Sequence, residues 1–145
     1  MELNLHSRAA ALPEIIIPAS EYDRLQSLAE AAARTSPLVA EYLDRELGRA
    51  RVLPDEAVGS DFARVGSLVT FRDDQTGRQR EVALAWPHEA DMSQDRISVL
   101  TSIGAALLGM RPGQTIDWPS PVGGPRTLTV IAVRNPGDPL PPAAA

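Results

Sequence analysis

The sequence contains neither cysteine nor lysine, and all 14 of its basic residues are arginine. Without cysteine, the chain cannot be a disulfide scaffold, a thiol protease, a redox dithiol protein or a zinc ribbon. Without lysine, it can contain neither a Walker-A phosphate loop nor a Schiff-base nucleophile, since both need the lysine amine. Several large classes of enzyme and metal protein are therefore excluded before any motif is considered.

Long apolar runs are also missing. The longest, such as residues 82–86, fall far short of the roughly 20 residues that a membrane span needs. Glu2 precedes any basic residue, and Pro13 and Glu14 interrupt the only apolar stretch near the start, so we expect no signal peptide and a cytoplasmic protein.

Positive charge is in deficit along the whole chain, whose formal net charge is −5. Residues 20–50 carry six acids against four arginines, and residues 54–145 carry eleven against eight. Because a phosphate backbone repels such a surface, we expect no direct nucleic-acid binding and no membrane contact.

The 145 residues and 15.5 kDa suit one compact domain, or a small domain carrying one short extra element. We divide the chain into four parts, which are a flexible leader (1–14), a short antiparallel coiled-coil hairpin (15–53), a β domain (54–135) and a Pro/Ala-rich tail (136–145). The predicted fold class is α+β, with an N-terminal helical hairpin followed by an antiparallel β domain that contains one short helix.

The hairpin is predicted from two apolar stripes at helical spacing that follow an extended Ile15–Ile17 segment. Ser20 is the expected N-cap of the first helix, and Ser36 followed by Pro37 marks the start of the second. Only residues 33–36 separate the stripes, so the helices should run antiparallel. The stripes are Leu25, Leu28, Ala29 and Ala32, and then Val39, Leu43, Leu47 and Ala50.

After Pro54 the apolar spacing changes to the period of two that is typical of strands. We expect a hairpin of strands 65–71 and 81–86 around a turn at 73–77, and a polar loop over 87–94. A short strand (97–100), a buried helix (103–110) and a strand pair (115–118 with 126–134, around Pro121, Gly123 and Gly124) complete the predicted domain.

No group of residues matches a known catalytic or metal motif. His88, Glu89 and Asp91 lie close together but lack metal-ligand spacing. Adjacent acids such as Asp73 and Asp74 are more typical of turns than of acid–base catalysis. Ser98, Thr101 and Ser102 form a hydroxyl cluster without a nucleophile elbow. We therefore predict no catalytic residue, no metal ion and no cofactor.

One ordered run resembles the C-terminal domain of the Gre transcription elongation factors, in which an Ile-Ser-Val strand leads into Ser-Pro-x-Gly-x-Ala-Leu-x-Gly. Residues 96–109 read Arg-Ile-Ser-Val-Leu-Thr-Ser-Ile-Gly-Ala-Ala-Leu-Leu-Gly, and residues 113–118 and 128–133 continue the pattern as paired strands. With the short hairpin included, residues 15–134 resemble the Rnk family of Gre-like proteins, which have a truncated coiled coil.

The resemblance implies an FKBP-like β domain that binds RNA polymerase, a protein partner, near the mouth of its secondary channel. The implied contact residues are Asp95, Arg96, Ile97, Ser98, Val99, Leu100, Thr101 and Ser102. The chain departs from the family where Thr101 and Ser102 replace the usual Ser-Pro step. This departure favours an alternative, in which a Gre-like module binds a different protein partner.

Gre factors stimulate transcript cleavage with acidic residues at the tip of a long coiled coil. The tip here is Arg34, Thr35 and Ser36, without a carboxylate, and Glu30 and Glu41 lie a turn back. We therefore expect a non-catalytic, monomeric regulator that competes with Gre-type factors by occupying their site.

Two hypotheses in which the protein is an enzyme have less support in the sequence than the regulator hypothesis. A prolyl isomerase would need an aromatic-lined cavity, and we expect the aromatics Phe62, Phe71, Trp86 and Trp118 to be used in the core. An enzyme built on His88 and Asp91 would show a deep polar pocket around them.

Overall fold

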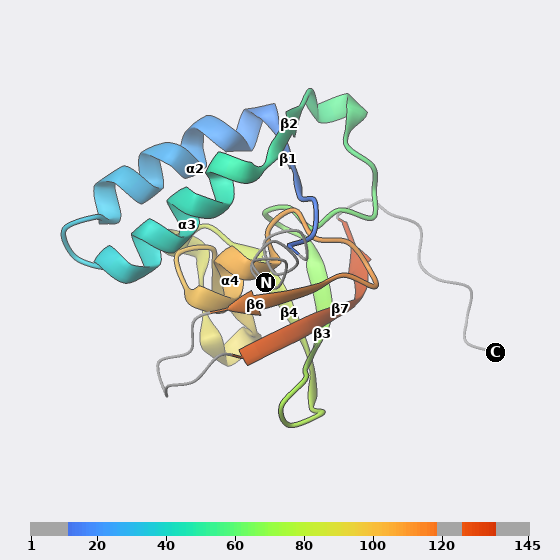
Figure 1. Ribbon diagram of the computed structural model, residues 1–145. Helices are drawn as coiled ribbons and strands as arrows, with labels where there is room; N and C mark the ends of the chain where they lie inside the picture. The colour runs from blue at the N-terminus through green and yellow to red at the C-terminus, as the bar shows by residue number, and fades with distance from the viewer. Residues whose placement is uncertain (1–11, 119–125, 136–145) are drawn as a thin grey trace, which may run out of the picture.

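The computed structural model describes residues 12–118 and 126–135. Two helices form the upper layer in Figure 1, and a five-stranded sheet with one short helix lies beneath them. Residues 1–11 of the expected leader (1–14), the turn at Pro121, Gly123 and Gly124, and the tail 136–145 lie outside the described residues. Among the described helices, none is long and apolar enough to cross a membrane.

Two short strands form the base of the helical pair. Strand β1 (Ile16–Pro18) pairs in parallel with β2 (Arg51–Leu53), so the chain leaves and re-enters the lower layer at one place. The extended conformation expected for the isoleucine run is present, and its three isoleucines are buried. The second strand was not predicted, since its three residues carry no period of their own.

The two expected helices are α2 (Ala19–Ala32) and α3 (Pro37–Arg49). They lie side by side and run in opposite directions, joined at one end by residues 33–36 (Figure 1). The start predicted for α2 is wrong, because Pro18 occupies the N-cap position and Ser20 lies inside the helix. The Ser36–Pro37 start of α3 is correct in position, although the Ser36 side chain makes no capping hydrogen bond.

The sheet has the strand order β5-β4-β3-β7-β6. Its strands are β3 (Leu68–Asp73), β4 (Gln79–Ala85), β5 (Arg96–Ser98), β6 (Thr115–Trp118) and β7 (Arg126–Arg134). Three of the four pairings are antiparallel, as predicted. The prediction of a wholly antiparallel sheet is wrong at one edge, where β5 pairs with β4 in parallel.

The parallel edge follows from the ten residues that separate Ala85 from Arg96. They fold into two short 3-10 turns, η2 (Pro87–Glu89) and η3 (Met92–Gln94), which carry the chain back so that Arg96, the first residue of β5, pairs with Ala83 near the end of β4. A parallel return needs about a dozen connecting residues, which a hairpin turn does not have. The polar loop predicted over 87–94 is therefore this crossover.

Helix α4 (Ser102–Leu107) is the centre of the molecule. It contacts α3 on one side and β5 and β6 on the other, and its last four residues are buried. Apolar side chains from the helical pair and the sheet form one continuous cluster around it. The cluster includes Leu25, Leu43, Leu47, Val69, Val82, Leu84, Leu107, Leu108, Met110, Ile116 and Leu128.

A polar cluster also ties the start of α2 to the segment before β3. Asp55, in the 3-10 turn η1 (Asp55–Ala57), accepts hydrogen bonds from the backbone N–H and hydroxyl of Ser20. These bonds lower the pKa of Asp55. Glu21 accepts a hydrogen bond from the Val65 N–H and pairs with Arg64 at 3.4 Å. Burial nevertheless raises the pKa of Glu21, against the lowering effects of Val65 and Arg64.

Because the layers share one core, Leu43→Ala should destabilise both together. Leu43 is fully buried, and such a truncation costs about 2–5 kcal/mol. Far-ultraviolet circular dichroism and tryptophan fluorescence should therefore report the same shifted urea transition. Leu38→Ala, at an 80 % exposed site, should change stability by less than about 0.5 kcal/mol. A shift seen by circular dichroism alone would contradict a shared core.

The half-buried Glu21 should make stability depend on pH. A carboxyl group whose pKa is raised by folding stabilises the folded state when protonated, and this contribution is lost as the pH rises through the folded pKa. Urea unfolding between about pH 4.5 and pH 7.5 should therefore show that Glu21→Gln gains stability relative to the native chain as pH increases. The Asp55 contribution, lost only as the pH falls through its lowered pKa, lies below this window. Parallel pH profiles for the two chains would show the assignment to be wrong.

Candidate functional site

The turn that joins β5 to α4 is held by side-chain hydrogen bonds. Thr101 is the N-cap of α4, where its hydroxyl accepts from the Gly104 N–H at 3.0 Å and donates to the Ser98 carbonyl at 2.7 Å. The Ser98 hydroxyl accepts from the Leu100 N–H at 2.9 Å. Two hydroxyls thus form hydrogen bonds with backbone groups that have no backbone partner at the start of the helix and the end of the strand.

Gly104 is required by the close approach of α4 to the end of β5. A Cβ atom at this position would lie 2.0 Å from the Ser98 carbonyl oxygen, which is a backbone atom and cannot move aside. Only glycine therefore fits at this step, and any larger residue would push α4 away from the strand.

The eight predicted contact residues divide by exposure. Asp95 and Arg96 are exposed, whereas Ser98, Leu100, Thr101 and Ser102 are half-buried. Of the remaining two, Ile97 and Val99 are 4 % and 0 % exposed and belong to the core. Alternation along the chain turns these two side chains inward, so Val99 is closed to a partner and Ile97 reaches the surface only at a hollow beside the turn. Ser98 holds the turn itself, so its replacement would disturb the fold as well as a contact.

A shallow hollow of about 270 Å³ lies beside this turn, and we call it the turn hollow. Its walls are mainly apolar, and Met92 at its edge is 67 % exposed. Sequence reasoning missed this feature, because Met92, Arg80 and Trp118 come from three separate elements. The hollow is lined by Arg80, Met92, Ile97, Thr101, Ser102, Ile103 and Trp118.

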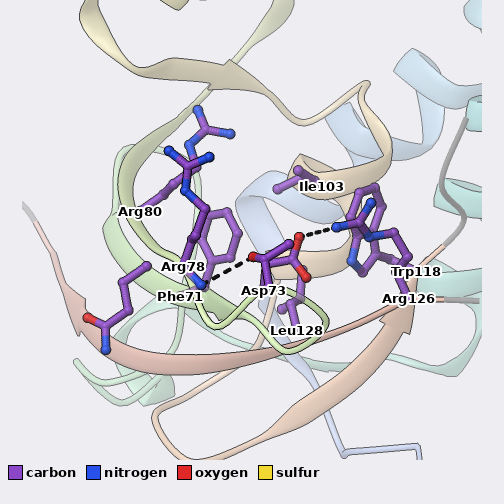
Figure 2. Close-up of a pocket in the computed structure, with 10 residues that line it drawn as sticks. Phe71, Asp73, Arg78, Arg80, Ile103, Trp118, Arg126 and Leu128 are labelled. Atoms are coloured by element: carbon purple, nitrogen blue, oxygen red, sulfur yellow. Dashed lines mark hydrogen bonds and ion pairs between the residues drawn. The ribbon is translucent and has the colours of Figure 1, made fainter. Parts of the chain in front are cut away.

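A second hollow of about 430 Å³ adjoins the first, and we call it the sheet hollow (Figure 2). Arg80, Ile103 and Trp118 line both. In Figure 2, Arg78 and Arg80 lie on one side, Trp118 and Arg126 on the other, and Asp73 lies between them. Phe71, Ile103 and Leu128 supply the apolar part of the wall. The alternation of Arg78 and Arg80 was the available sequence signal, since residues two apart share a strand face.

The four aromatic residues predicted to serve the core do so to different degrees, with Phe71 in the core cluster and Trp86 and Trp118 packed against it. Phe71 is buried, but Trp118 is half-exposed and lines both hollows. Trp86 carries the Arg24 guanidinium 3.9 Å above its ring, and Phe62 faces that of Arg111 at 5.5 Å. Two arginine contacts therefore cover rings that the core does not fully bury.

The acids singled out in the sequence, Asp73, Asp74 and Asp91, have structural partners. Asp91 accepts hydrogen bonds from the Ser93 N–H and hydroxyl at the start of η3, and these bonds lower its pKa. Burial acts to raise the pKa of Asp74, but hydrogen bonds from Arg72, Thr129 and Thr127 outweigh this effect, so the pKa is lowered overall. Asp73 pairs with Arg126.

His88 faces Glu89 at 3.8 Å on the exposed surface. Neither His88 nor Asp91 lies in the wall of the turn hollow or of the sheet hollow, and no three metal-ligating side chains converge within residues 12–118 and 126–135.

The hairpin tip is the second predicted site. Arg34, Thr35 and Ser36 are all exposed, as is Leu38 in the first turn of α3. Glu30, Glu41 and Asp44 lie back from the tip, beside a groove between the two helices. The most distal part of the hairpin therefore offers a cation and hydroxyls and no carboxylate.

Comparison with known proteins gives both parts of the chain a family. The Rnk N-terminus family matches residues 13–53, and the C-terminal family of transcription elongation factors GreA/GreB matches residues 58–135. The regulator of nucleoside diphosphate kinase from Escherichia coli (strain K12) is 34% identical over 82% of this chain and 88% of its own length.

Gre proteins are similar in sequence over a shorter part of the chain, and a solved Gre structure shares the fold. GreA from Rhodospirillum rubrum is 34% identical over 63% of this chain and 58% of its own length. The solved GreA/GreB elongation factor from Nitrosomonas europaea is 32% identical, with a TM-score of 0.65 over 84% of this chain and 98% of its own. With its two matched parts in this order, the chain belongs to the Rnk family of GreA/GreB-like proteins.

Proposed function

We propose that this protein is a non-catalytic regulator that binds RNA polymerase near its secondary channel and competes there with Gre-type factors. The observation that carries the proposal is the surface beside the β5–α4 turn, where an exposed methionine borders an apolar hollow. We call this surface the docking face and define it by Met92, Asp95, Arg96, Leu100, Ser102 and Ile103.

The docking face has the composition of a protein contact. Met92 offers a flexible and polarizable side chain, which suits contact with another protein. Asp95 and Arg96 are exposed charges at its edge, and Asp95 lies 3.8 Å from Arg80. An apolar centre with a polar rim is the usual anatomy of such interfaces.

The turn is also held in place before binding. The Ser98 hydroxyl, which accepts a hydrogen bond, and the Thr101 hydroxyl, which accepts one and donates another, order the backbone of residues 98–104, so little conformational entropy remains to be lost on association. Thr101 supplies the cap at the family's serine position, and Ser102 stands at the first helical position in place of proline. The loss of proline therefore leaves the hydrogen bonds of the turn in place.

The hairpin supports binding without transcript cleavage. The resemblance to Gre factors assigns cleavage to acidic residues at the tip of a long coiled coil. Here the tip carries Arg34, Thr35 and Ser36, and a 14-residue helix is only about 21 Å long at 1.5 Å per residue. Such an arm can occupy space at a channel entrance, but it lacks both the reach and the carboxylates for metal binding.

Titration of labelled protein with E. coli core RNA polymerase should give saturable binding that an added Gre factor displaces. Met92→Asp should weaken this binding about tenfold, since it places a charge in the apolar centre of the contact. Val52→Asp makes the same exchange at an exposed site on β2 and is the matched control. No binding at micromolar concentration, or equal effects of the two variants, would overturn the proposal.

In a backtracked elongation complex, saturating protein should leave the rate of transcript cleavage at the polymerase's own level and should slow the cleavage that a Gre factor stimulates. Arg34→Asp combined with Thr35→Glu should restore no activity, because the arm stays short. The length of the released RNA, resolved on a gel, is the measurement. Stimulated cleavage by the native chain would contradict a role by occupancy.

A different protein partner is the second candidate, favoured by the replacement of the Ser-Pro step with Thr101 and Ser102. Ser102→Pro separates the two. If polymerase is the partner, this variant should bind it at least as tightly as the native chain does. Absence of polymerase binding by both proteins, with the fold intact, would favour the second candidate.

A further inference from the structure

The Arg24 side chain of α2 stacks on the ring of Trp86. Its Cζ atom lies 3.9 Å from the ring centroid, whereas the other three arginine–ring pairs among the described residues are between 5.5 and 5.9 Å apart. Arg24 pairs with no carboxylate in the described part of the chain. A cation over the face of a tryptophan is attracted by the ring quadrupole, and tryptophan is the strongest aromatic partner. The stack therefore joins the helical pair to the segment that follows β4.

Trp86 lies at the point where both segments of the docking face join the sheet. Its neighbour Ala85 is the last residue of β4, and the Ala85 carbonyl accepts from the Val99 N–H, in the β5–α4 turn, at 3.0 Å. The Trp86 carbonyl accepts from the Glu89 N–H at 2.9 Å and so begins η2. The crossover (residues 86–95) and the turn are therefore both attached to the sheet at the end of β4.

The first half of the crossover depends on the Trp86 ring for its position. Residues 88–90 are exposed, whereas Trp86 packs against the core cluster. The second half is held by backbone hydrogen bonds of 2.9 and 3.0 Å that Asp91 and Arg96 exchange. A shift of the Trp86 ring would therefore move η2 and be passed along the chain to Met92.

The two long helices reach the docking face by different routes. Helix α3 packs on α4, which carries Ser102 and Ile103, through the buried core. Helix α2 reaches the crossover, which carries Met92 and Asp95, through the exposed side chain of Arg24. The second route can therefore be removed by one surface substitution that leaves no cavity in the core.

We propose that Arg24 is a positioning residue for the docking face, because its stack on Trp86 holds the crossover, and with it Met92, in the position that the protein partner meets. The inference rests on the proposed function for the identity of the docking face, and it adds a contact through which the helical arm regulates that face. Coupling between two sites is reciprocal. The stack therefore stabilises the bound complex, and a partner bound at the docking face stabilises the stack.

The direct test needs no polymerase and follows the Met92 methyl resonance in protein labelled with carbon-13 at the methionine methyl groups. The chain has three methionines, and Met92→Leu assigns the signal. Arg24→Ala should shift and broaden this resonance, because the crossover loses a contact that holds its first half, and should leave that of the buried Met110 unchanged. Arg24→Lys, which keeps a cation above the ring, should restore most of the native position.

Arg111→Ala is the matched control. Arg111 is an exposed arginine that faces the Phe62 ring at 5.5 Å, so its truncation also removes a cation–ring contact, but from a ring outside the crossover. This variant should leave the Met92 resonance in place. An unchanged Met92 resonance in Arg24→Ala, or an equal shift in both variants, would overturn the proposal.

The second measurement is polymerase binding by the same variants. Arg24→Ala should weaken binding to core RNA polymerase about fivefold, and Arg24→Lys should weaken it less. Arg111→Ala should bind as the native chain does. Urea unfolding checks that each variant is folded at the temperature of the binding measurement.

The outcomes separate the two claims. If native protein does not bind polymerase, the proposed function fails, and the methyl resonances still decide whether Arg24 holds the crossover. If native protein and Arg24→Ala bind polymerase equally well, the docking face stands and Arg24 does not position it.

Discussion

The close approach of Gly104 to the Ser98 carbonyl is the constraint on which the rest of the structure depends. It seats α4 against the end of β5 and leaves the helix between the sheet and the hairpin. From that position Ile103 borders both hollows, while Ala105, Ala106 and Leu107 fill the core beneath α3. A single residue without a side chain thus couples the surface around the two hollows to the packing of both layers.

Local signals in the sequence predicted the parts of the fold that local physics controls. The two apolar stripes, the Ser36–Pro37 start and the strands around β3, β4, β6 and β7 all depend on residues near one another in the chain. Contacts between residues far apart in the chain could not be predicted from such signals. The Asp55 carboxylate accepts from the Ser20 N–H at the start of α2, although the two residues are 35 positions apart in the chain. The parallel placement of β5 depends on how the preceding crossover folds.

The candidate site divides in the same way. The signature located the β5–α4 turn, and Asp95 and Arg96 are exposed there as expected. It could not tell inward from outward side chains, so Ile97 and Val99 were included although they are buried. The sheet hollow was missed because Arg78 and Arg126 line one hollow only through the pairing of β3 with both β4 and β7, which no short sequence motif encodes.

Because the base of the hairpin is packed on α4 while residues 33–38 project into solvent, the arm can change length over evolution only at its free end. Seven residues added to each helix would keep the apolar stripes in register and extend the arm by about 10.5 Å. Such an insertion touches neither the core nor the docking face. Arm length and tip chemistry can therefore diverge while the proposed docking face stays the same, so relatives that keep this face can carry arms of very different reach.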